Sequence, residues 1–134
     1  MAASFIDTNI LIYLVSSDAR KADAAEEAVR AGGYVSVQVL NEFANVARRK
    51  LGFSWTEVHM FLASCRALLD VVPLTTDVHD LGLRLAERYQ LSVYDAMIAA
   101  AALESGCDRL LSEDLQDGMT IEGLVIANPL KGLG

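Results

Sequence analysis

Four acidic residues in this chain stand out because of where they fall in the apolar pattern: Asp7, Glu42, Asp95 and Asp114. Asp7 directly follows the apolar run Ser4–Ile6, and Asp114 lies just beyond the run Arg109–Leu111. If both runs are parallel strands, their carboxyl ends meet at one edge of a sheet, where α/β proteins bind ligands. Carboxylates about 4 Å apart repel by roughly 4 kcal/mol at an effective dielectric of 20. Such a cluster therefore needs protons or divalent cations to neutralise it.

Each acid also has an ordinary structural explanation. Glu42 lies at the margin of an apolar helical stripe, so it could reach solvent or pair with an arginine. Ser92 and Asp95 have the spacing of a capping box, and an acid in the first turn suits the helix dipole. The helix that Asp95 would open is apolar on nearly every side, however, which predicts that it begins deep in the fold. Asp7 could equally cap a helix, and Asp114 could belong to a polar turn.

The donor types in this set indicate which cation would suit it. All four side chains offer oxygen, with no His or Cys adjacent, which favours Mg²⁺ or Mn²⁺ over zinc. Cys65 and Cys107 lack the paired spacing of a zinc site, and we expect them to be buried reduced thiols. Hard cations held by carboxylates are a common means of cleaving phosphodiesters with activated water.

The elements that would position these acids follow from the hydrophobic pattern. Apolar runs of strand length alternate with longer stretches of helical period, which predicts an α/β fold with a mainly parallel sheet. We expect strands at 4–6, 34–36, 71–74 and 109–111, and one last edge strand within 119–126. We expect helices at about 9–15, 19–31, 37–50, 54–69, 77–90 and 93–105, with Thr76 capping the fifth.

Length and composition indicate one folded domain spanning residues 1–134, with 53% hydrophobic and 22% charged residues. The formal net charge of −7 argues against a protein that binds nucleic acid through bulk positive charge. It leaves room for a nuclease whose acids surround bound cations. No apolar stretch is long enough for a membrane span and no targeting segment is visible, so we expect a cytoplasmic protein.

Four segments, in order along the chain, resemble the PIN-domain family and, within it, the VapC-like toxins of type II toxin–antitoxin systems. The segments are 5–14, 39–43, 91–101 and 110–118. The resemblance implies a three-layer α/β/α sandwich with a mainly parallel central sheet of about five short strands. It also implies an endoribonuclease that depends on Mg²⁺ or Mn²⁺ and cleaves RNA with metal-activated water.

The resemblance also assigns roles to residues and partners. By position it makes Asp7, Glu42, Asp95 and Asp114 the catalytic, metal-binding acids. The residues matched as supporting positions are Asn9, Ser112 and Asp117, of which Asp117 matches an acid that is not always present. Relatives in this branch are typically homodimers held inactive by a small antitoxin protein, so the resemblance implies both partners here.

Two other functions stay open at this point. The chain could be a metal-binding PIN-like module that binds RNA or protein without cleaving, or a hydrolase of small phosphoesters. A complete acid set favours cleavage, and the Asp-x-Asp pair of haloacid-dehalogenase-type phosphatases is absent, because Thr8 and Asn9 follow Asp7. The run 48–50, with Arg84 and Arg88, offers candidate RNA contacts but is equally typical of a solvated helix face.

Overall fold

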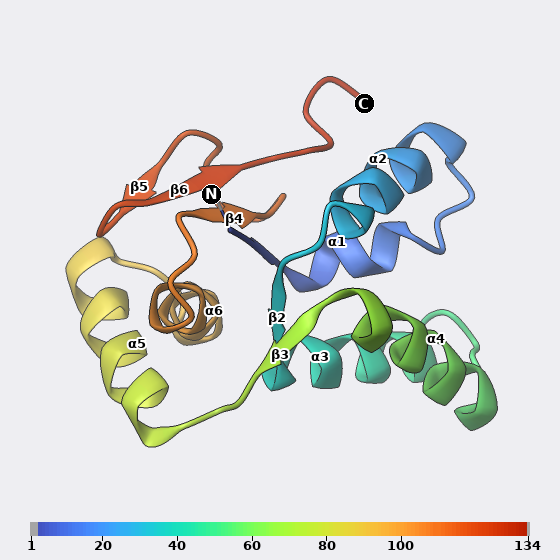
Figure 1. The fold of residues 1–134 in the computed structure, drawn as a ribbon, viewed down its shortest axis with the longest axis horizontal. Coiled ribbons are helices and arrows are strands. Elements are labelled where there is room, and N and C mark those ends of the chain that lie inside the picture. Colours follow the sequence, from blue (N-terminus) through green and yellow to red (C-terminus); the bar gives the residue numbers. More distant parts are fainter. Residues whose placement is uncertain (1–2, 134) are drawn as a thin grey trace.

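The computed structural model describes residues 3–133 and arranges them as helices on both sides of a central sheet (Figure 1). In chain order the elements are β1 (Ser4–Ile6), α1 (Thr8–Tyr13), α2 (Ala19–Arg30), β2 (Tyr34–Ser36), α3 (Val37–Arg49), α4 (Trp55–Leu68), β3 (Asp70–Val72), α5 (Thr76–Tyr89), α6 (Val93–Glu104), β4 (Arg109–Leu111), β5 (Thr120–Ile121) and β6 (Leu124–Ala127). This is the predicted α/β/α architecture with a mainly parallel sheet.

The order of the strands decides where the sheet can hold a site. The sheet runs β3-β2-β1-β4-β6-β5, and every neighbouring pair is parallel except β5 and β6. The chain builds outward from β1 through β2 to β3, and later returns to the other side of β1 with β4. The strand order therefore reverses between β1 and β4, and the carboxyl ends at such a reversal form a crevice suited to ligands.

The C-terminal part of the sheet differs from the sequence prediction. One edge strand was predicted within 119–126, but the segment forms a hairpin of β5 and β6, which raises the sheet to six strands. Glu122 and Gly123 make the turn with φ values of +50° and +87°, as a tight two-residue hairpin requires. β6 then lies inside the sheet as the parallel neighbour of β4, and β5 forms the edge.

Local signals fix most of the helix ends. The predicted capping box of α4 is present, because Ser54 Oγ accepts from the Glu57 N–H and Glu57 Oε1 accepts from the Ser54 N–H. The predicted cap of α5 was wrong by one residue, since Thr75 rather than Thr76 accepts from the Val78 N–H. The preceding strand β3 ends at Val72, because Pro73 has no N–H to continue the ladder.

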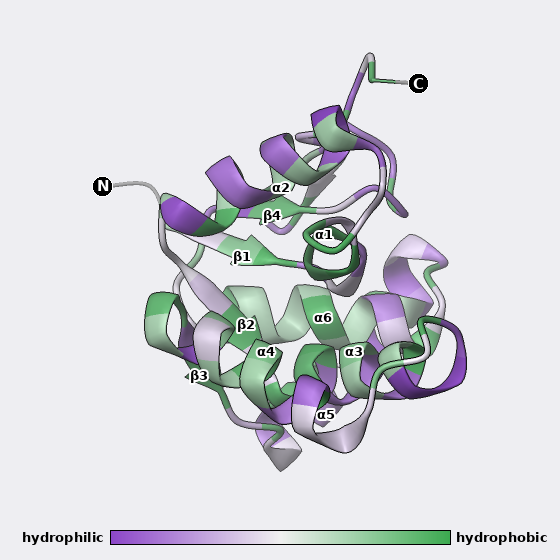
Figure 2. Ribbon diagram, turned by 90° about the vertical axis from the view of Figure 1, so that its right-hand side faces the viewer, coloured by the Kyte–Doolittle hydropathy of each residue, from purple (hydrophilic) through white to green (hydrophobic). Residues whose placement is uncertain are grey.

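The core is centred on α6, which is apolar and continuously buried from Ala96 to Ala102 (Figure 2). It packs closely against α5 through Gly82, where an added Cβ would collide with the side chain of Met97. Cys65 and Cys107 are buried and unbridged, as predicted. None of the helices in the described part is long and apolar enough to span a membrane.

Candidate active site

The first pair of site residues is brought together by the adjacent strands β1 and β4. Their register pairs Ile6 with Leu111, and the Asp7 N–H donates to the Leu111 carbonyl at 3.0 Å. The next residues, Asp7 and Ser112, therefore leave the sheet side by side. Ser112 Oγ donates to Asp7 Oδ2 at 2.7 Å, and both residues are almost completely buried.

Ser112 also positions the acid that follows it. Its Oγ accepts a hydrogen bond of 3.1 Å from the Asp114 N–H, which folds the chain back just after β4. One buried hydroxyl thus connects the carboxylate of Asp7 with the backbone of Asp114. Asp114 itself is exposed, so it lies on the solvent side of the buried pair Asp7 and Ser112.

Glu42 reaches the same place from α3. This helix starts immediately after β2, with Ser36 as its N-cap, so its first turns lie at the carboxyl edge of the sheet. Glu42 Oε1 accepts from Thr8 Oγ1 at 2.5 Å, and Oε2 accepts from Gln38 Nε2 at 3.1 Å. Glu42 is half-buried and is turned toward the residue after Asp7, and it pairs with no arginine in the described part.

Asp95 lies in the first turn of α6, where its N–H donates to the Ser92 hydroxyl at 3.2 Å. Gln38 Nε2 also donates to the carbonyl of Tyr94 at 3.1 Å, which ties the start of α6 to α3. Asp95 is half-buried. Ser92 therefore caps α6 as predicted, and the same turn brings the Asp95 carboxylate within reach of the charges of Asp114 and Glu42.

The pKa values show that these acids influence one another. Burial raises the pKa of Asp7 to about 6, the hydrogen bonds from Ser112 and Thr8 oppose the rise, and the charges of Asp114 and Asp95 add to it. Burial likewise raises the pKa of Asp95; the hydrogen bond with Ser92 opposes this rise, and the charges of Asp114 and Glu42 add to it. The charges of the other acids therefore reach Asp7 and Asp95 at the carboxyl edge of the sheet and disfavour the ionisation of these two carboxyl groups.

The donor set fits a hard divalent cation in its chemistry, because all four side chains are carboxylates. Within residues 3–133, no three acidic, His or Cys side chains already converge as a ready-made ligand set. The reason is visible in the hydrogen bonds: Asp7 faces Ser112 and the Thr8 N–H, while Glu42 faces Thr8 and Gln38. Ligation would require some of these carboxylates to turn from these donors toward the cation.

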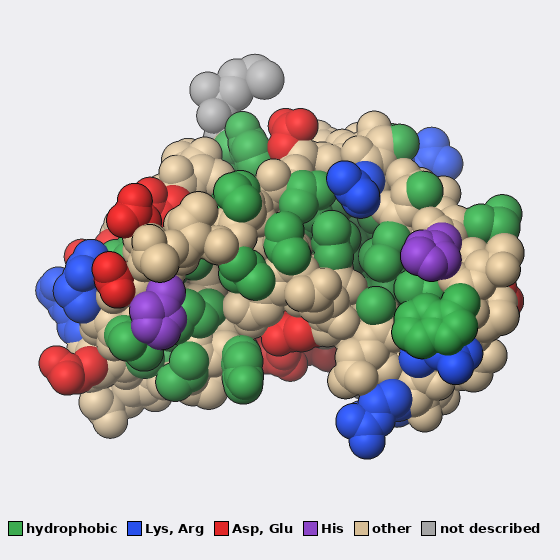
Figure 3. Space-filling view, turned by 90° about the horizontal axis from the view of Figure 1, so that it is seen from below, with side chains coloured by type: hydrophobic (Ala, Val, Ile, Leu, Met, Phe, Trp, Pro, Cys, Tyr) green, Lys and Arg blue, Asp and Glu red, His purple; other side chains and the backbone are tan. Residues whose placement is uncertain are grey.

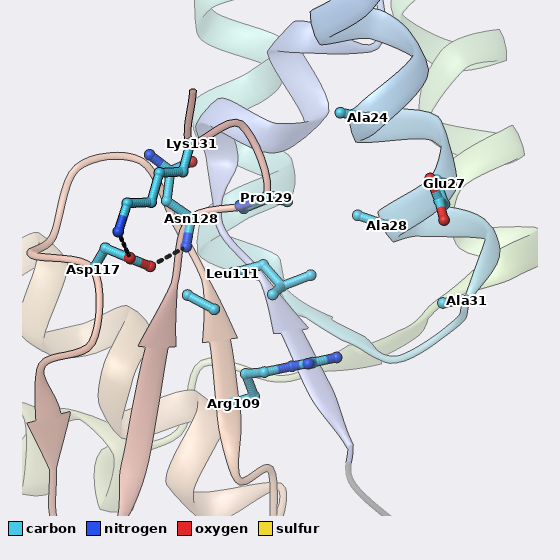
Figure 4. Close-up of a pocket in the computed structure, with 11 residues that line it drawn as sticks. Ala24, Glu27, Ala28, Ala31, Arg109, Leu111, Asp117, Asn128, Pro129 and Lys131 are labelled. Atoms are coloured by element: carbon cyan, nitrogen blue, oxygen red, sulfur yellow. Dashed lines mark hydrogen bonds and ion pairs between the residues drawn. The ribbon is translucent and has the colours of Figure 1, made fainter. Parts of the chain in front are cut away.

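Asn9 and Asp117 were matched to supporting positions. Asn9 Oδ1 accepts from the Glu113 N–H at 3.3 Å, while its buried Nδ2 has no hydrogen-bond partner among the described residues. Asp117 instead accepts from the Asn128 N–H at 2.8 Å and from Lys131 Nζ at 3.0 Å (Figure 4). These contacts hold the segment after β6 against the loop that follows β4, and the structure shows no bond between Asp117 and the four acids.

Sequence reasoning missed two residues that hold the site together. Thr8 and Gln38 each donate to a different oxygen of Glu42, and Thr8 also donates its N–H to Asp7 Oδ1 at 2.7 Å. Gln38 lies one helical turn before Glu42, so helical spacing offered a signal for it. Thr8 gave no comparable signal, because its partner Glu42 is 34 residues away in the sequence.

Comparisons with known proteins agree with this architecture. A family model described as PIN domain matches residues 4–116. A search of curated protein sequences gave no match. Among solved structures, the chain is similar to a toxin–antitoxin complex from Klebsiella pneumoniae, with 22% identity, a TM-score of 0.74, and coverage of 95% of this chain and 98% of the other.

Two further structures have the same fold. VapBC2 from Rickettsia felis, bound to a DNA fragment from its promoter, has 17% identity, a TM-score of 0.68 and coverage of 94% and 98%. VapC20 of Mycobacterium tuberculosis, a toxin that cleaves the sarcin–ricin loop, has 20% identity, a TM-score of 0.68 and coverage of 84% and 92%. With the family match extending over most of its length, the chain belongs to the PIN domain family.

Proposed function

We propose that this protein is an endoribonuclease dependent on Mg²⁺ or Mn²⁺ and the toxin of a toxin–antitoxin pair. The observation that carries the proposal is that Asp7 and Asp114, joined through Ser112, lie beside a sheet reversal, with Glu42 hydrogen-bonded to Thr8 and the start of α6 tied to α3 through Gln38. Such a concentration of carboxylates disfavours the apo protein and favours a bound divalent cation. The similar structures from toxin–antitoxin systems support the biological role.

In this proposal each site residue has a distinct task. Asp7, Glu42, Asp95 and Asp114 would hold the cation. A bound Mg²⁺ or Mn²⁺ supplies Lewis-acid activation of water and of the phosphate. Ser112 keeps Asp7 oriented and favours its ionised form. The free Asn9 Nδ2 is a buried donor suited to a phosphate oxygen or a water beside the acids.

The partners in this proposal are an RNA substrate, a small antitoxin protein and a second copy of the chain, and the protein would act in the cytoplasm. The antitoxin is supported by solved complexes from Klebsiella pneumoniae and Rickettsia felis that share this fold. The RNA substrate is supported by the similar toxin that cleaves the sarcin–ricin loop.

The test is cleavage of a single-stranded RNA labelled with a fluorophore and a quencher. We expect cleavage with Mg²⁺ or Mn²⁺, none with EDTA, and none by Asp7→Asn prepared in the same way. Asp23→Asn is the matched control, because Asp23 is an exposed acid on α2 and the substitution makes the same charge change. Undiminished cleavage by Asp7→Asn would refute the assignment, and cation binding without cleavage of any RNA would favour the non-cleaving module.

A further inference from the structure

Helix α3 carries a polar stripe that extends away from the acids. Gln38, Glu42, Asn45 and Arg49 are spaced by four, three and four residues, so they lie within about 60° of one another around the helix. The buried stripe of Val39, Phe43 and Ala47 is on a different side of α3. The polar stripe begins at Gln38 and Glu42, which belong to the site, and ends at an exposed arginine.

The far end of this stripe opens into a pocket of about 470 Å³, lined by Asn45, Val46, Arg49 and Lys50. We call it the α3 pocket. Glu42 and Arg49 are two helical turns apart, which is about 10.5 Å along the axis. A strand of RNA whose phosphate lies at the acids therefore needs only a short extension to reach the α3 pocket.

The basic side chains of the α3 pocket, Arg49 and Lys50, are available to bind an anion. Arg48 is engaged elsewhere, because it donates to the Phe53 carbonyl at 2.8 Å and lies over the Trp55 ring at 4.5 Å. Arg49 and Lys50, by contrast, form no ion pair or side-chain hydrogen bond within residues 3–133. Figure 3 shows acidic side chains in a recess at the lower edge of one face, with basic side chains to the right of it and others at the far left of the molecule.

We propose that the α3 pocket binds the RNA backbone next to the phosphate that is cleaved, with Arg49 on a neighbouring phosphate and Asn45 on a phosphate or ribose oxygen. The inference rests on the proposed function, since it extends the same site. A guanidinium binds phosphate through two parallel hydrogen bonds, and an amide can donate to a phosphate or pair with the 2′-hydroxyl. In a chain of net charge −7, a local cation pair two helical turns from Glu42 would add to the attraction for a polyanion.

The experiment measures binding of a fluorescent single-stranded RNA across a salt series in EDTA, with Asp7→Asn as the parent so that the RNA stays intact. We expect Arg49→Ala in this parent to weaken binding roughly three- to tenfold. We also expect the slope of log K against log salt to fall by about 0.7, the value for one lost phosphate contact on a single strand. Arg49→Lys should keep most of the slope and lose part of the affinity.

The matched control is Arg66→Ala. Arg66 is an exposed arginine in the last turn of α4, with no ion pair in the part of the chain that the structure describes. Helix α4 leads into β3, whose first residue Asp70 pairs with Tyr34 at the start of β2, so Arg66 lies near the amino edge of the sheet, opposite the acids. We expect Arg66→Ala to leave affinity and slope unchanged.

The outcomes separate this inference from the proposed function. If Arg49→Ala leaves the salt slope unchanged, or if Arg66→Ala weakens RNA binding as much as Arg49→Ala does, the proposal that the α3 pocket binds RNA is overturned. Either result leaves the proposed RNA cleavage untouched. Cleavage that fails with the otherwise unsubstituted protein, together with a slope that depends on Arg49, overturns the nuclease assignment and supports the binding site. If the protein binds no single-stranded RNA in this assay, the α3 pocket is overturned, while the nuclease assignment is decided by the cleavage assay with Mg²⁺ or Mn²⁺. In the active protein, Arg49→Ala should raise KM more than it lowers kcat.

Discussion

Ser112 Oγ donates a hydrogen bond of 2.7 Å to Oδ2 of Asp7, although the two residues are 105 positions apart in the chain. The bond lowers the pKa of Asp7 against the larger effect of burial, which raises it to about 6. A carboxylate can serve as a metal ligand only in its ionised form. Ser112 therefore widens the pH range in which Asp7 is ready to bind a cation.

The first prediction concerns this hydroxyl. Ser112→Ala should raise the pKa of Asp7 further, so the acid limb of the pH profile of kcat/KM should move to higher pH. It should also cost about 1–3 kcal/mol of stability, because Asp7 Oδ2 and the Asp114 N–H lose their buried partner. A pH profile of RNA cleavage and urea unfolding measure the two effects. If the acid limb of the Ser112→Ala profile did not move, the Ser112 hydroxyl would have no effect on the ionisation of Asp7.

The second prediction concerns the stability of the metal-free protein. The pKa of Asp7 is raised from 3.8 to about 6 in the folded state, so the folded protein holds this proton more tightly than the unfolded chain. The folded state therefore loses stability as the pH rises from about 4 through about 6. Asp7→Asn, which carries no such charge, should be more stable than the unsubstituted protein by roughly 3 kcal/mol at pH 7.5.

The measurement is urea unfolding in EDTA at pH 7.5 and again near pH 4, where the advantage of Asp7→Asn should disappear. Asp23→Asn again serves as the control, because it changes the same charge on an exposed helix. If Asp7→Asn were no more stable than the parent at pH 7.5, the ionised Asp7 carboxylate would not be the unfavourable group that its burial indicates.

The third prediction concerns metal addition. Mg²⁺ or Mn²⁺ at about a hundred times its dissociation constant should stabilise the protein by about 2.7 kcal/mol, which a thermal melt detects as a rise in Tm. The rise should be smaller at pH 5.5 than at pH 7.5, because protons then compete for Asp7. Asp7→Asn should show little or none of it. An equal rise in Asp7→Asn would place the cation elsewhere on the molecule.

Much of this site could be predicted from strand ends and helix caps, because those signals are local. Asp7 follows β1 as predicted, and Asp114 lies just beyond β4. Once the sheet is taken as parallel, topology alone brings such positions to one edge. Asp95 is a different case: the apolar character of α6 predicted a helix that begins deep in the fold, but Val93 and Tyr94 are exposed and Asp95 is half-buried, so burial is complete only from Ala96 onward.

Other features depend on contacts between distant parts of the chain, which no local pattern encodes. The hairpin at Glu122 and Gly123 was missed, because a Glu in a turn with positive φ is unusual and the flanking strands are very short. The bond between Thr8 and Glu42 was missed because it depends on how α1 packs against α3. Ser112, which orients Asp7, was expected as a supporting residue, whereas Thr8 and Gln38, which donate to Glu42, were not.

The last prediction concerns one of these orienting side chains, Gln38. Its amide donates at 3.1 Å to Glu42 Oε2 and at 3.1 Å to the Tyr94 carbonyl, so it joins an acid of α3 to the first turn of α6, which carries Asp95. Gln38→Ala should remove the hydrogen bonds to Glu42 and to the Tyr94 carbonyl. We expect kcat for RNA cleavage to fall about tenfold while KM changes little. Gln38→Glu should be worse, because it adds a like charge next to Glu42.

Asn41→Ala is the control for Gln38, since Asn41 is exposed on the same helix and lies about 100° around it from Glu42. A merely structural role for Gln38 would lower the Tm and leave kcat per folded molecule unchanged. A positioning role should instead lower kcat in protein that melts normally, and it should weaken the stabilisation by Mn²⁺, because Glu42 and Asp95 would no longer be held in a fixed relation. Equal kcat values for Gln38→Ala and Asn41→Ala would show that the geometry of the acids does not depend on this amide.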